Sequence, residues 1–569
     1  MNGSGSIREI SAESDALHLG MGWDFEEISM PNIIIESTYG ESHPGSSHLL
    51  TLSNHVRDGV LAAGGRPALF VTTDICDGVA QGGYSMQFSL LSREIIASMV
   101  EIHVEASLCD GLVLISSCDK SVPAHLMAAA RLDRPSIFVP GGCMSAGADF
   151  MTVDRLWDLR EQYCQGDITM QHYCSCQANS CPSAGACQPM GTAATMQVVS
   201  EALGLALPGT AITPAVNNAI ARNAKAAGKQ ILKLIEAGIT TSQILTKQAF
   251  ENAITVHAAI GGSANAILHI IAAAKEVGVD ITLDTFENAN KKTPYLVNIM
   301  NTGKYPNEFL WYSGGVPAIM NEIRDLLHLD VLTVSGKTLR ENLDEWDQSG
   351  KQISQNEYLK NYSVLPGEII SKRENPLNSD GGLAILKGNI APDGSVIKHS
   401  AVTSDMYHFV GTVRAYDNED AVLEAFRKKQ FEKGDVIVIT HQGPRACGMP
   451  EMFRTSDAIN HYPEKNIAVI TDGRYSGCTS GPAIGYVTPE AAMGGAIGLL
   501  KDGDKVEIDI PNRRMNFVVF NEHMEAQDGT KVLDERALNH SPKRIDLHKG
   551  VRGIYQRLAS SASEGARMI

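Results

Sequence analysis

The chain has 569 residues, of which 43% are hydrophobic and 20% charged, a balance typical of folded globular proteins and not of disordered, collagenous or coiled-coil chains. Its length predicts two or more packed units. The net charge is −17, and the sequence has no Lys/Arg-rich block, so we do not expect nucleic acid to be a partner.

Two further features limit where the protein acts. A bilayer span needs about 18–20 apolar residues, and the best candidate, 264–277, is interrupted by His269, Lys275 and Glu276. The start, MNGSGSIREISAESD, has no basic segment followed by an apolar run, so it is not a signal peptide. We therefore expect no membrane association and a cytoplasmic location, where clustered cysteines act as ligands more often than as disulfides.

Apolar runs alternate with helical patterns from about residue 31 to residue 213. The almost continuously hydrophobic runs, typical of strands buried on both faces, are 67–73, 111–116 and 135–140. The intervening segments with helical apolar spacing are 88–106 and 122–132. This order predicts a parallel sheet covered by helices, with ligands at the carboxyl ends of the strands.

A helix-rich stretch, from about residue 214 to residue 343, is expected to cover this sheet. The segment 348–380 is polar and rich in turn residues, which indicates a connection between two units. We therefore predict an α/β fold with an N-terminal parallel-sheet domain at residues 1–365 and a β-rich, barrel-like domain at residues 366–569.

The second unit contains segments whose apolar period is close to two. Two of them resemble hairpins with turns at PDG and PN, and two resemble buried strands: 383–402, 503–520, 434–440 and 466–473. These segments are the basis for predicting a β-rich domain.

The loops that follow two predicted strands each place a cysteine directly before an aspartate: Cys76–Asp77 and Cys118–Asp119. Thiolates suit iron–sulfur clusters or zinc, whereas carboxylates suit magnesium or manganese. The pairs therefore indicate two neighbouring metal centres. For either dipeptide alone, the alternative is a buried cysteine without a ligand beside a capping aspartate.

A third candidate is the segment 174–187, which contains four cysteines: Cys174, Cys176, Cys181 and Cys187. It lacks the paired C-x2-C spacing of common zinc modules, so a closed zinc site is possible but not favoured. We expect at least one of these thiolates to be a ligand.

Two glycine-rich segments of the second unit carry reactive groups. Glu451, in GMPEM (448–452), offers another hard oxygen ligand. Ser476 follows a predicted buried strand within the segment 471–485, where we expect it to face a cleft. The alternative for Ser476 is turn chemistry, and its surroundings do not form a G-x-S-x-G elbow.

Several long segments resemble the family of dihydroxy-acid, phosphogluconate and sugar-acid dehydratases, in the same order over nearly the whole chain. They are SCDKSVP (117–123), GACQPMGTAATMQVVSEALGLALPG (185–209), AFENAITVHAAIGGSANAILH (249–269), KGNIAPDGSVIK (387–398) and ITDGRYSGCTSGPAIGYVTPEAAMGG (470–495). The resemblance implies an iron–sulfur dehydratase that removes water from a 2,3-dihydroxy acid to give a 2-oxo acid.

The resemblance also implies the ligands of the iron–sulfur cluster. The family pattern makes Cys118 and Cys187 cluster ligands, but this chain has Gly45 where many relatives have a cysteine in a P-C-N-x-H-L motif. Cys76, in a CDG sequence found in phosphogluconate-type members, is the natural substitute. The cluster type is therefore left open between 2Fe-2S and 4Fe-4S.

The same pattern implies a magnesium site formed by Asp77, Asp119, Lys120 and Glu451, with Lys120 carbamylated. A carbamate converts a cationic amine into an anionic oxygen ligand, which a dication attracts. Ser476 matches the base that the family uses to remove the C2 proton.

The substrate implied by the resemblance is a small hydroxy acid. The opening GMGWDFEEISMPNIIIES (20–37), the CDG sequence and two later stretches favour an aldonate, as in xylonate-type dehydratases. The second choice is the dihydroxy-acid dehydratase of valine and isoleucine synthesis, and the third is phosphogluconate dehydratase. An iron–sulfur redox or regulatory protein is an alternative of another class, and the family implies a homodimer or homotetramer.

Overall fold

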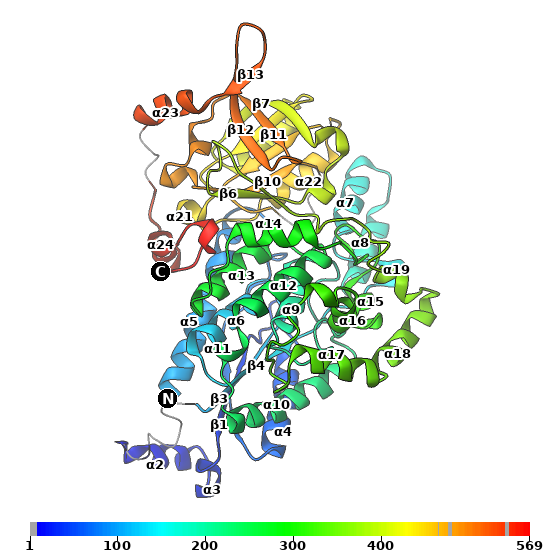
Figure 1. Ribbon diagram of the computed structural model, residues 1–569, viewed down its shortest axis with the longest axis vertical. Coiled ribbons are helices and arrows are strands. Elements are labelled where there is room, and N and C mark those ends of the chain that lie inside the picture. The colour runs from blue at the N-terminus through cyan, green and yellow to red at the C-terminus, as the bar shows by residue number, and fades with distance from the viewer. Residues whose placement is uncertain (1–7, 9, 108, 465, 476–480, 541–544) are drawn as a thin grey trace.

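The computed structural model describes residues 8, 10–107, 109–464, 466–475, 481–540 and 545–569. The N-terminal half is built around a four-stranded sheet in the order β2-β1-β3-β4, with every pair of neighbours parallel (Figure 1). Its strands are β1 (Asn32–Ser37), β2 (Arg66–Val71), β3 (Gly111–Ser116) and β4 (Ser136–Pro140).

Three of these strands coincide with the predicted apolar runs. The fourth, β1, lies between β2 and β3 and is buried along its whole length, but the sequence analysis did not single it out. The helices between the strands are α4 (Leu49–Ala62), α5 (Ser89–Ser107) and α6 (Ser121–Leu132). The last two confirm the helices predicted from apolar spacing.

The order of the strands determines where the helices lie. The chain moves from β1 to β2 in one direction and from β2 past β1 to β3 and β4 in the other. Because such crossovers are right-handed, α4 covers one face of the sheet, and α5 and α6 cover the other. The reversal makes the gap between β1 and β3 the topological switch point, where open α/β sheets bind their ligands.

Further helices thicken both sides of the sheet, as predicted. Helix α10 packs on α4, whereas α13 and α9 pack on α6. The helices outside the sheet crossovers of this half are α2 (Glu13–Gly20), α3 (Phe25–Ile28), α7 (Leu156–Gln165), α8 (Met170–Ser180), α9 (Thr192–Ala202), α10 (Ala219–Ala237), α11 (Thr241–Ile244), α12 (Lys247–Ala259), α13 (Asn265–Glu276), α14 (Leu283–Lys292), α15 (Asn307–Tyr312), α16 (Gly315–Glu322), α17 (Leu339–Gln348), α18 (Lys351–Asn356) and α19 (Pro366–Ile369).

The C-terminal half contains a nine-stranded sheet in the order β13-β12-β11-β7-β8-β9-β10-β6-β5. Strands β7 to β10 are parallel neighbours at its centre, and antiparallel hairpins extend both edges. The strands are β5 (Ala384–Leu386), β6 (Gly394–Ile397), β7 (His408–Tyr416), β8 (Asp435–Ile439), β9 (Ala468–Thr471), β10 (Ala483–Thr488), β11 (Lys505–Asp509), β12 (Arg514–Phe520) and β13 (Ala526–Asp528). This arrangement confirms the predicted hairpins, buried strands and fold class.

Helices of this half are α20 (Glu419–Arg427), α21 (Pro444–Cys447), α22 (Phe453–His461), α23 (Thr530–Leu538) and α24 (Val551–Leu558). The end of the chain returns to the N-terminal half. The fully buried Arg93 of α5 donates hydrogen bonds of 2.8 Å and 3.1 Å to the carbonyl oxygens of Gly565 and Ala566. This contact joins the end of the chain to the N-terminal half. The domain boundary between residues 365 and 366 stays a prediction.

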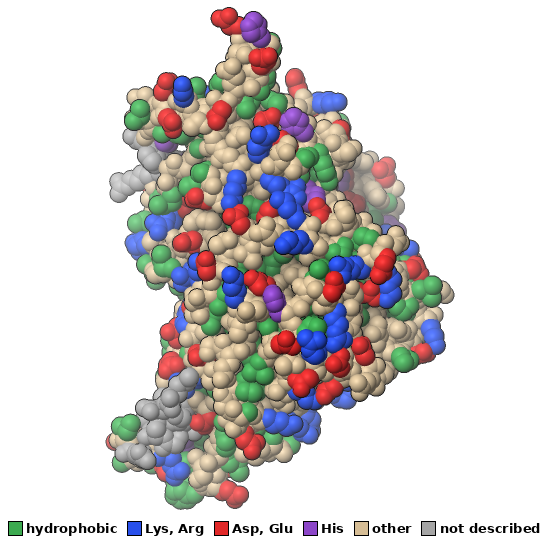
Figure 2. Space-filling view, in the orientation of Figure 1, with side chains coloured by type: hydrophobic (Ala, Val, Ile, Leu, Met, Phe, Trp, Pro, Cys, Tyr) green, Lys and Arg blue, Asp and Glu red, His purple; other side chains and the backbone are tan. Residues whose placement is uncertain are grey.

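The surface agrees with the predicted charge distribution. On the face seen in Figure 2, acidic and basic side chains are interspersed, without a continuous basic field among the residues described. Within the described part of the chain, no helix has both the length and the apolar character required to cross a membrane.

Candidate active site

The candidate site lies at the carboxyl ends of β1, β2 and β3. Cys76 and Asp77 follow β2, and Cys118, Asp119 and Lys120 follow β3. The loop after β1, which passes through residues 38–48, meets them at the switch point. The parallel sheet thus brings together residues that are about 40 positions apart in sequence, which explains why both Cys–Asp dipeptides belong to one site.

Two thiols and an imidazole form a compact group at this point. Single donor atoms of His43, Cys76 and Cys118 all lie within 4.8 Å of one another. A hydrogen bond between the thiols lowers the pKa of Cys76 and raises that of Cys118 well above its ordinary value. Cys76 therefore loses its proton more easily than Cys118 does. This suits a pair of thiols that binds a metal, because metal binding removes both protons.

Sequence reasoning missed His43, whose ring orientation follows from its neighbours. The Ser46 hydroxyl donates to the carbonyl oxygen of Gly40 at 3.1 Å, so it accepts from Nε2 of His43 at 3.2 Å. This leaves Nδ1 of His43 unprotonated, and that buried atom has no hydrogen-bond partner within the described part of the chain. A bare ring nitrogen beside two thiols suits a soft metal centre.

Gly45 stands next to this group. A Cβ atom added at Gly45 would lie 3.2 Å from Sγ of Cys118 and 3.1 Å from Nδ1 of His43. A side chain at this position would therefore start beside the thiol of Cys118. The thiol of Cys76 lies close to that of Cys118, and its role as a cluster ligand stays a prediction.

Hard oxygen donors lie beside the thiols. The fully buried Lys120 donates from Nζ to Oδ2 of Asp77 at 2.7 Å. The Ser89 hydroxyl lies 2.8 Å and 2.9 Å from the two oxygens of the same carboxylate. Burial opposes the charge on Asp77, but the cations of Lys120 and Arg474 outweigh it and lower the pKa of Asp77. Asp77 is therefore an ionised ligand candidate.

Glu451 reaches this region from the C-terminal half. Asn265, at the start of α13, donates to Oε1 of Glu451 at 2.9 Å, and its own Oδ1 accepts from Arg474 at 3.3 Å and Tyr486 at 2.5 Å. Arg474 is fully buried and lies 4.0 Å from Oδ2 of Asp77. Asn265 and Arg474 thus join the two halves of the site, and sequence reasoning assigned a role to neither.

The pKa values of Asp119 and Glu451 are raised, in contrast to that of Asp77. Burial, together with the negative charge of Asp77, raises the pKa of Asp119 above its ordinary value. Burial also raises the pKa of Glu451 to about 7, although Arg474 acts in the opposite direction. Asp77 and Glu451 are buried, Asp119 is half-buried, and all three line one cavity, so they offer it carboxylate oxygens of the kind that a divalent cation binds.

A cavity of about 780 Å³ opens onto the carboxylates and Cys187, whereas His43, Cys76 and Cys118 are not among its lining residues in the described part of the chain. Asp77, Asp119, Cys187 and Glu451 all line it, so the structure brings these predicted residues together. Ser476 follows β9 in sequence but lies outside the described residues. Of the other clustered cysteines, Cys174 and Cys181 are exposed and Cys176 is half-buried, and they are not among the described residues that line the cavity.

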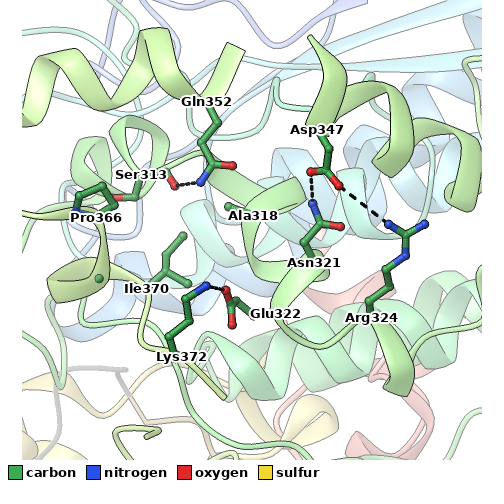
Figure 3. Close-up of a pocket in the computed structure, with 11 residues that line it drawn as sticks. Ser313, Ala318, Asn321, Glu322, Arg324, Asp347, Gln352, Pro366, Ile370 and Lys372 are labelled. Carbon is green, nitrogen blue, oxygen red and sulfur yellow. Dashed lines mark hydrogen bonds and ion pairs between the residues drawn. The ribbon is translucent and has the colours of Figure 1, made fainter. Parts of the chain in front are cut away.

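A second hollow, of about 410 Å³, lies among α15, α16, α18 and α19 (Figure 3). Its charged side chains face one another: Lys372 pairs with Glu322, and Arg324 lies 4.0 Å from Asp347. Its described lining contains neither a thiol nor a group of converging carboxylates. This hollow therefore lacks the chemistry of the larger cavity.

Comparison with known proteins gives a consistent result along the whole chain. Residues 30–342 match the family model described as dihydroxy-acid/6-phosphogluconate dehydratase N-terminal, and residues 368–566 match the C-terminal model of the same description. The dihydroxy-acid dehydratase of Halothermothrix orenii is 42% identical over 558 residues, which is 97% of each chain. That of Ignicoccus hospitalis is 39% identical over 568 residues, 99% of this chain and 98% of the relative. That of Methanobrevibacter smithii is 41% identical over 552 residues, 95% of this chain and 94% of the relative.

Proposed function

The chain belongs to the dihydroxy-acid/6-phosphogluconate dehydratase family and is a dehydratase, and we propose that its substrate is a short 2,3-dihydroxy acid with a branched alkyl end. The product is the corresponding 2-oxo acid, as in the synthesis of valine and isoleucine. The observation that carries the proposal is that one cavity is lined by the thiol of Cys187 and by the carboxylates of Asp77, Asp119 and Glu451, two of which directly follow Cys76 and Cys118 in the sequence.

This substrate is the second choice of the sequence analysis, which put an aldonate first. Relatives that are about 40% identical over nearly the whole chain are named dihydroxy-acid dehydratase, which favours the second choice. An iron–sulfur redox protein has no use for Asp77, Asp119, Lys120 and Glu451, so the buried carboxylate set counts against that alternative.

Family membership implies an iron–sulfur cluster and magnesium. Cys118, Cys187 and Cys76 would hold the cluster, and Asp77, Asp119, Glu451 and a carbamylated Lys120 would hold magnesium. What supports this assignment is that Cys76 and Cys118 lie together and that Cys187 shares one cavity with the three carboxylates. When bound, these groups supply Lewis-acid positions for substrate oxygens. The type of cluster stays open between 2Fe-2S and 4Fe-4S.

The side chains supply the remaining steps. Carbamylation of Lys120 would replace its ion pair with Asp77 by a second anionic oxygen donor, so both side chains would face the same cation. Ser476, acting as its alkoxide, takes the proton from C2 and becomes a neutral hydroxyl while the hydroxyl on C3 leaves as hydroxide. The resulting enol tautomerises to the 2-oxo acid, and the removed proton and hydroxide together make up the water lost. Asn265 and Arg474 keep Glu451 and Asp77 in place.

The partner in this proposal is the small hydroxy acid. Assembly into a homodimer or homotetramer and a cytoplasmic location are proposed from the family resemblance.

The substrate is tested by measuring 2-oxo acid formation by anaerobically purified protein with Mg²⁺ from 2,3-dihydroxyisovalerate, D-xylonate and D-gluconate in parallel. We expect the highest kcat/KM with 2,3-dihydroxyisovalerate. A clear preference for either aldonate would reject the proposed substrate while leaving the dehydratase reaction intact.

A further inference from the structure

Side chains from a hairpin of two helices, α7 and α8, line part of the cavity, and the hairpin lies beside α22 of the C-terminal half (Figure 1). None of the residues of α7 is buried, and Ser180 is the single buried residue that the structure describes in α8. The hairpin therefore packs against the rest of the protein through few buried side chains. The side chains of α7 and α8 that line the cavity can contact a molecule bound in it.

One of these side chains forms an aromatic wall with α22. The rings of Trp157, in α7, and Phe453, at the start of α22, have centroids 4.6 Å apart, and both residues line the cavity. Val153, Leu156 and Met300 line the same cavity. Both halves of the molecule thus contribute apolar side chains to the cavity, beside charged side chains of α7 and α22.

Most of the charged groups in this part of the cavity are paired with protein atoms, whereas Oδ1 of Asp154 is buried without a hydrogen-bond partner in the described part of the chain. Nε2 of His461 lies 3.4 Å from Asp158, and its Nδ1 lies 3.3 Å from the carboxylate of Asp457. Arg155 donates to the carbonyl oxygen of Asp149 at 3.2 Å, and the guanidinium of Arg160 lies 5.9 Å from the centroid of the Trp157 ring. A polyhydroxy acid needs several polar partners for its hydroxyl groups, and binding one here would disrupt these pairs.

We propose that Trp157, supported by Phe453, determines specificity by packing against the alkyl end of the substrate. This inference rests on the proposed function, because it assumes that the carboxylate end of the acid faces Asp77 and Glu451. An apolar wall favours a branched alkyl group and gains little from a substrate that lacks one. The expected discrimination is about 10- to 200-fold, the range that an apolar pocket achieves for small alkyl differences.

The test is the affinity of the anaerobic holoenzyme for two products, 3-methyl-2-oxobutanoate and pyruvate, which differ by the branched alkyl end. Titration calorimetry is applied to the wild type, Trp157→Ala and the conservative Trp157→Phe. The wild type should bind the branched acid at least about 10-fold more tightly than pyruvate. Trp157→Ala should reduce this ratio to within about 3-fold of unity, and Trp157→Phe should keep most of it.

Iron content and melting temperature of each variant show whether its fold and cluster are intact. An unchanged ratio in Trp157→Ala, equal weakening of both acids, or a wild type that does not discriminate would each overturn the role of Trp157. Failure of the proposed function is a separate result, because it appears as a wild type that does not convert 2,3-dihydroxyisovalerate.

Discussion

Lys120 and Asp77 form a buried ion pair, 2.7 Å from Nζ to Oδ2, beneath the cavity. Both side chains are almost completely shielded from water, and the pair lies next to a second buried cation, Arg474. Breaking such a pair from one side leaves an uncompensated charge in a poorly solvated place. The pair therefore contributes to stability as well as to the proposed magnesium site.

The first prediction follows from this pair. Lys120→Met should lower the free energy of unfolding of the metal-free protein by up to about 3–5 kcal/mol, because it leaves the buried Asp77 carboxylate with the more distant Arg474 as its remaining cation. It should also abolish turnover. Denaturant unfolding measures the first effect, with Lys360→Met as control, since Lys360 is 72% exposed in its pair with Glu357.

The double variant Asp77→Asn/Lys120→Met separates the two effects. It should regain most of the lost stability while staying inactive. Recovery of activity in the double variant would show that neither residue is needed for the reaction.

The second prediction concerns the third thiolate of the cluster. Cys76→Ser should lose most of its iron and sulfide, because Gly45 supplies no substitute. Cys76→Ser/Gly45→Cys should recover both, since a side chain at position 45 starts 3.2 Å from Sγ of Cys118. Iron and sulfide per chain and the visible spectrum of anaerobic protein check this. Full iron in Cys76→Ser would show that Cys76 is not a ligand.

A third prediction addresses the base. Ser476→Ala should lower kcat by about 10²–10⁴-fold, the usual contribution of a positioned proton acceptor. Iron, sulfide and the affinity for the product should stay at wild-type values, because the residue is proposed to act on the C2 proton alone. Exchange of that proton with deuterium in the solvent gives a direct readout. Near wild-type turnover would assign the base to another group.

The fourth prediction is that the stability of the protein depends on pH through Glu36, a residue outside the candidate active site. Burial in β1 raises the pKa of Glu36 to about 9 from an ordinary value of 4.5. Between these values the folded state keeps a proton that the unfolded state releases, so the stability from Glu36 is fully present below pH 4.5 and is lost as pH rises toward 9.

Glu36→Gln should remove this loss, which amounts to at most about 1.4 kcal/mol per pH unit. At pH 8 the variant should therefore be more stable than the wild type, and at pH 5 the two should be similar. Denaturant unfolding across this range, with Glu236→Gln on α10 as control, measures the difference. If the free energy of unfolding changed with pH in the same way for the wild type and Glu36→Gln, the predicted effect would be contradicted.

Much of the fold was predictable because buried parallel strands have a strong apolar signal. The runs that became β3 and β8 stand out in the sequence, and the spacing of α6 leaves almost every residue buried. The central strand β1 was harder to recognise, because its run NIIIES ends on the buried polar residues Glu36 and Ser37. Position in the sheet, rather than composition, keeps those two residues inside.

The sequence predicts the reactive groups of the site. It does not predict the side chains that hold those groups in place. Cys118 and Asp119 sit in a motif at the end of a strand, where ligand residues are expected. Asn265 and Arg474 act through contacts between segments about 200 positions apart, which no local pattern reveals. Arg474 lies within the TDGRYSG segment that also contains Ser476, and His43 precedes Gly45 by two positions. Both residues therefore lie in segments that the sequence alone marks as functional.

The central claim is that the thiols and the carboxylates hold two separate groups that serve one reaction. The most direct test is the rate of 2-oxo acid formation from 2,3-dihydroxyisovalerate after Mg²⁺ is removed anaerobically with a chelator, with iron measured in the same sample. The account predicts that turnover disappears while iron stays bound, and that added Mg²⁺ restores the rate. Turnover that continues without Mg²⁺, or iron that leaves together with it, would contradict the claim.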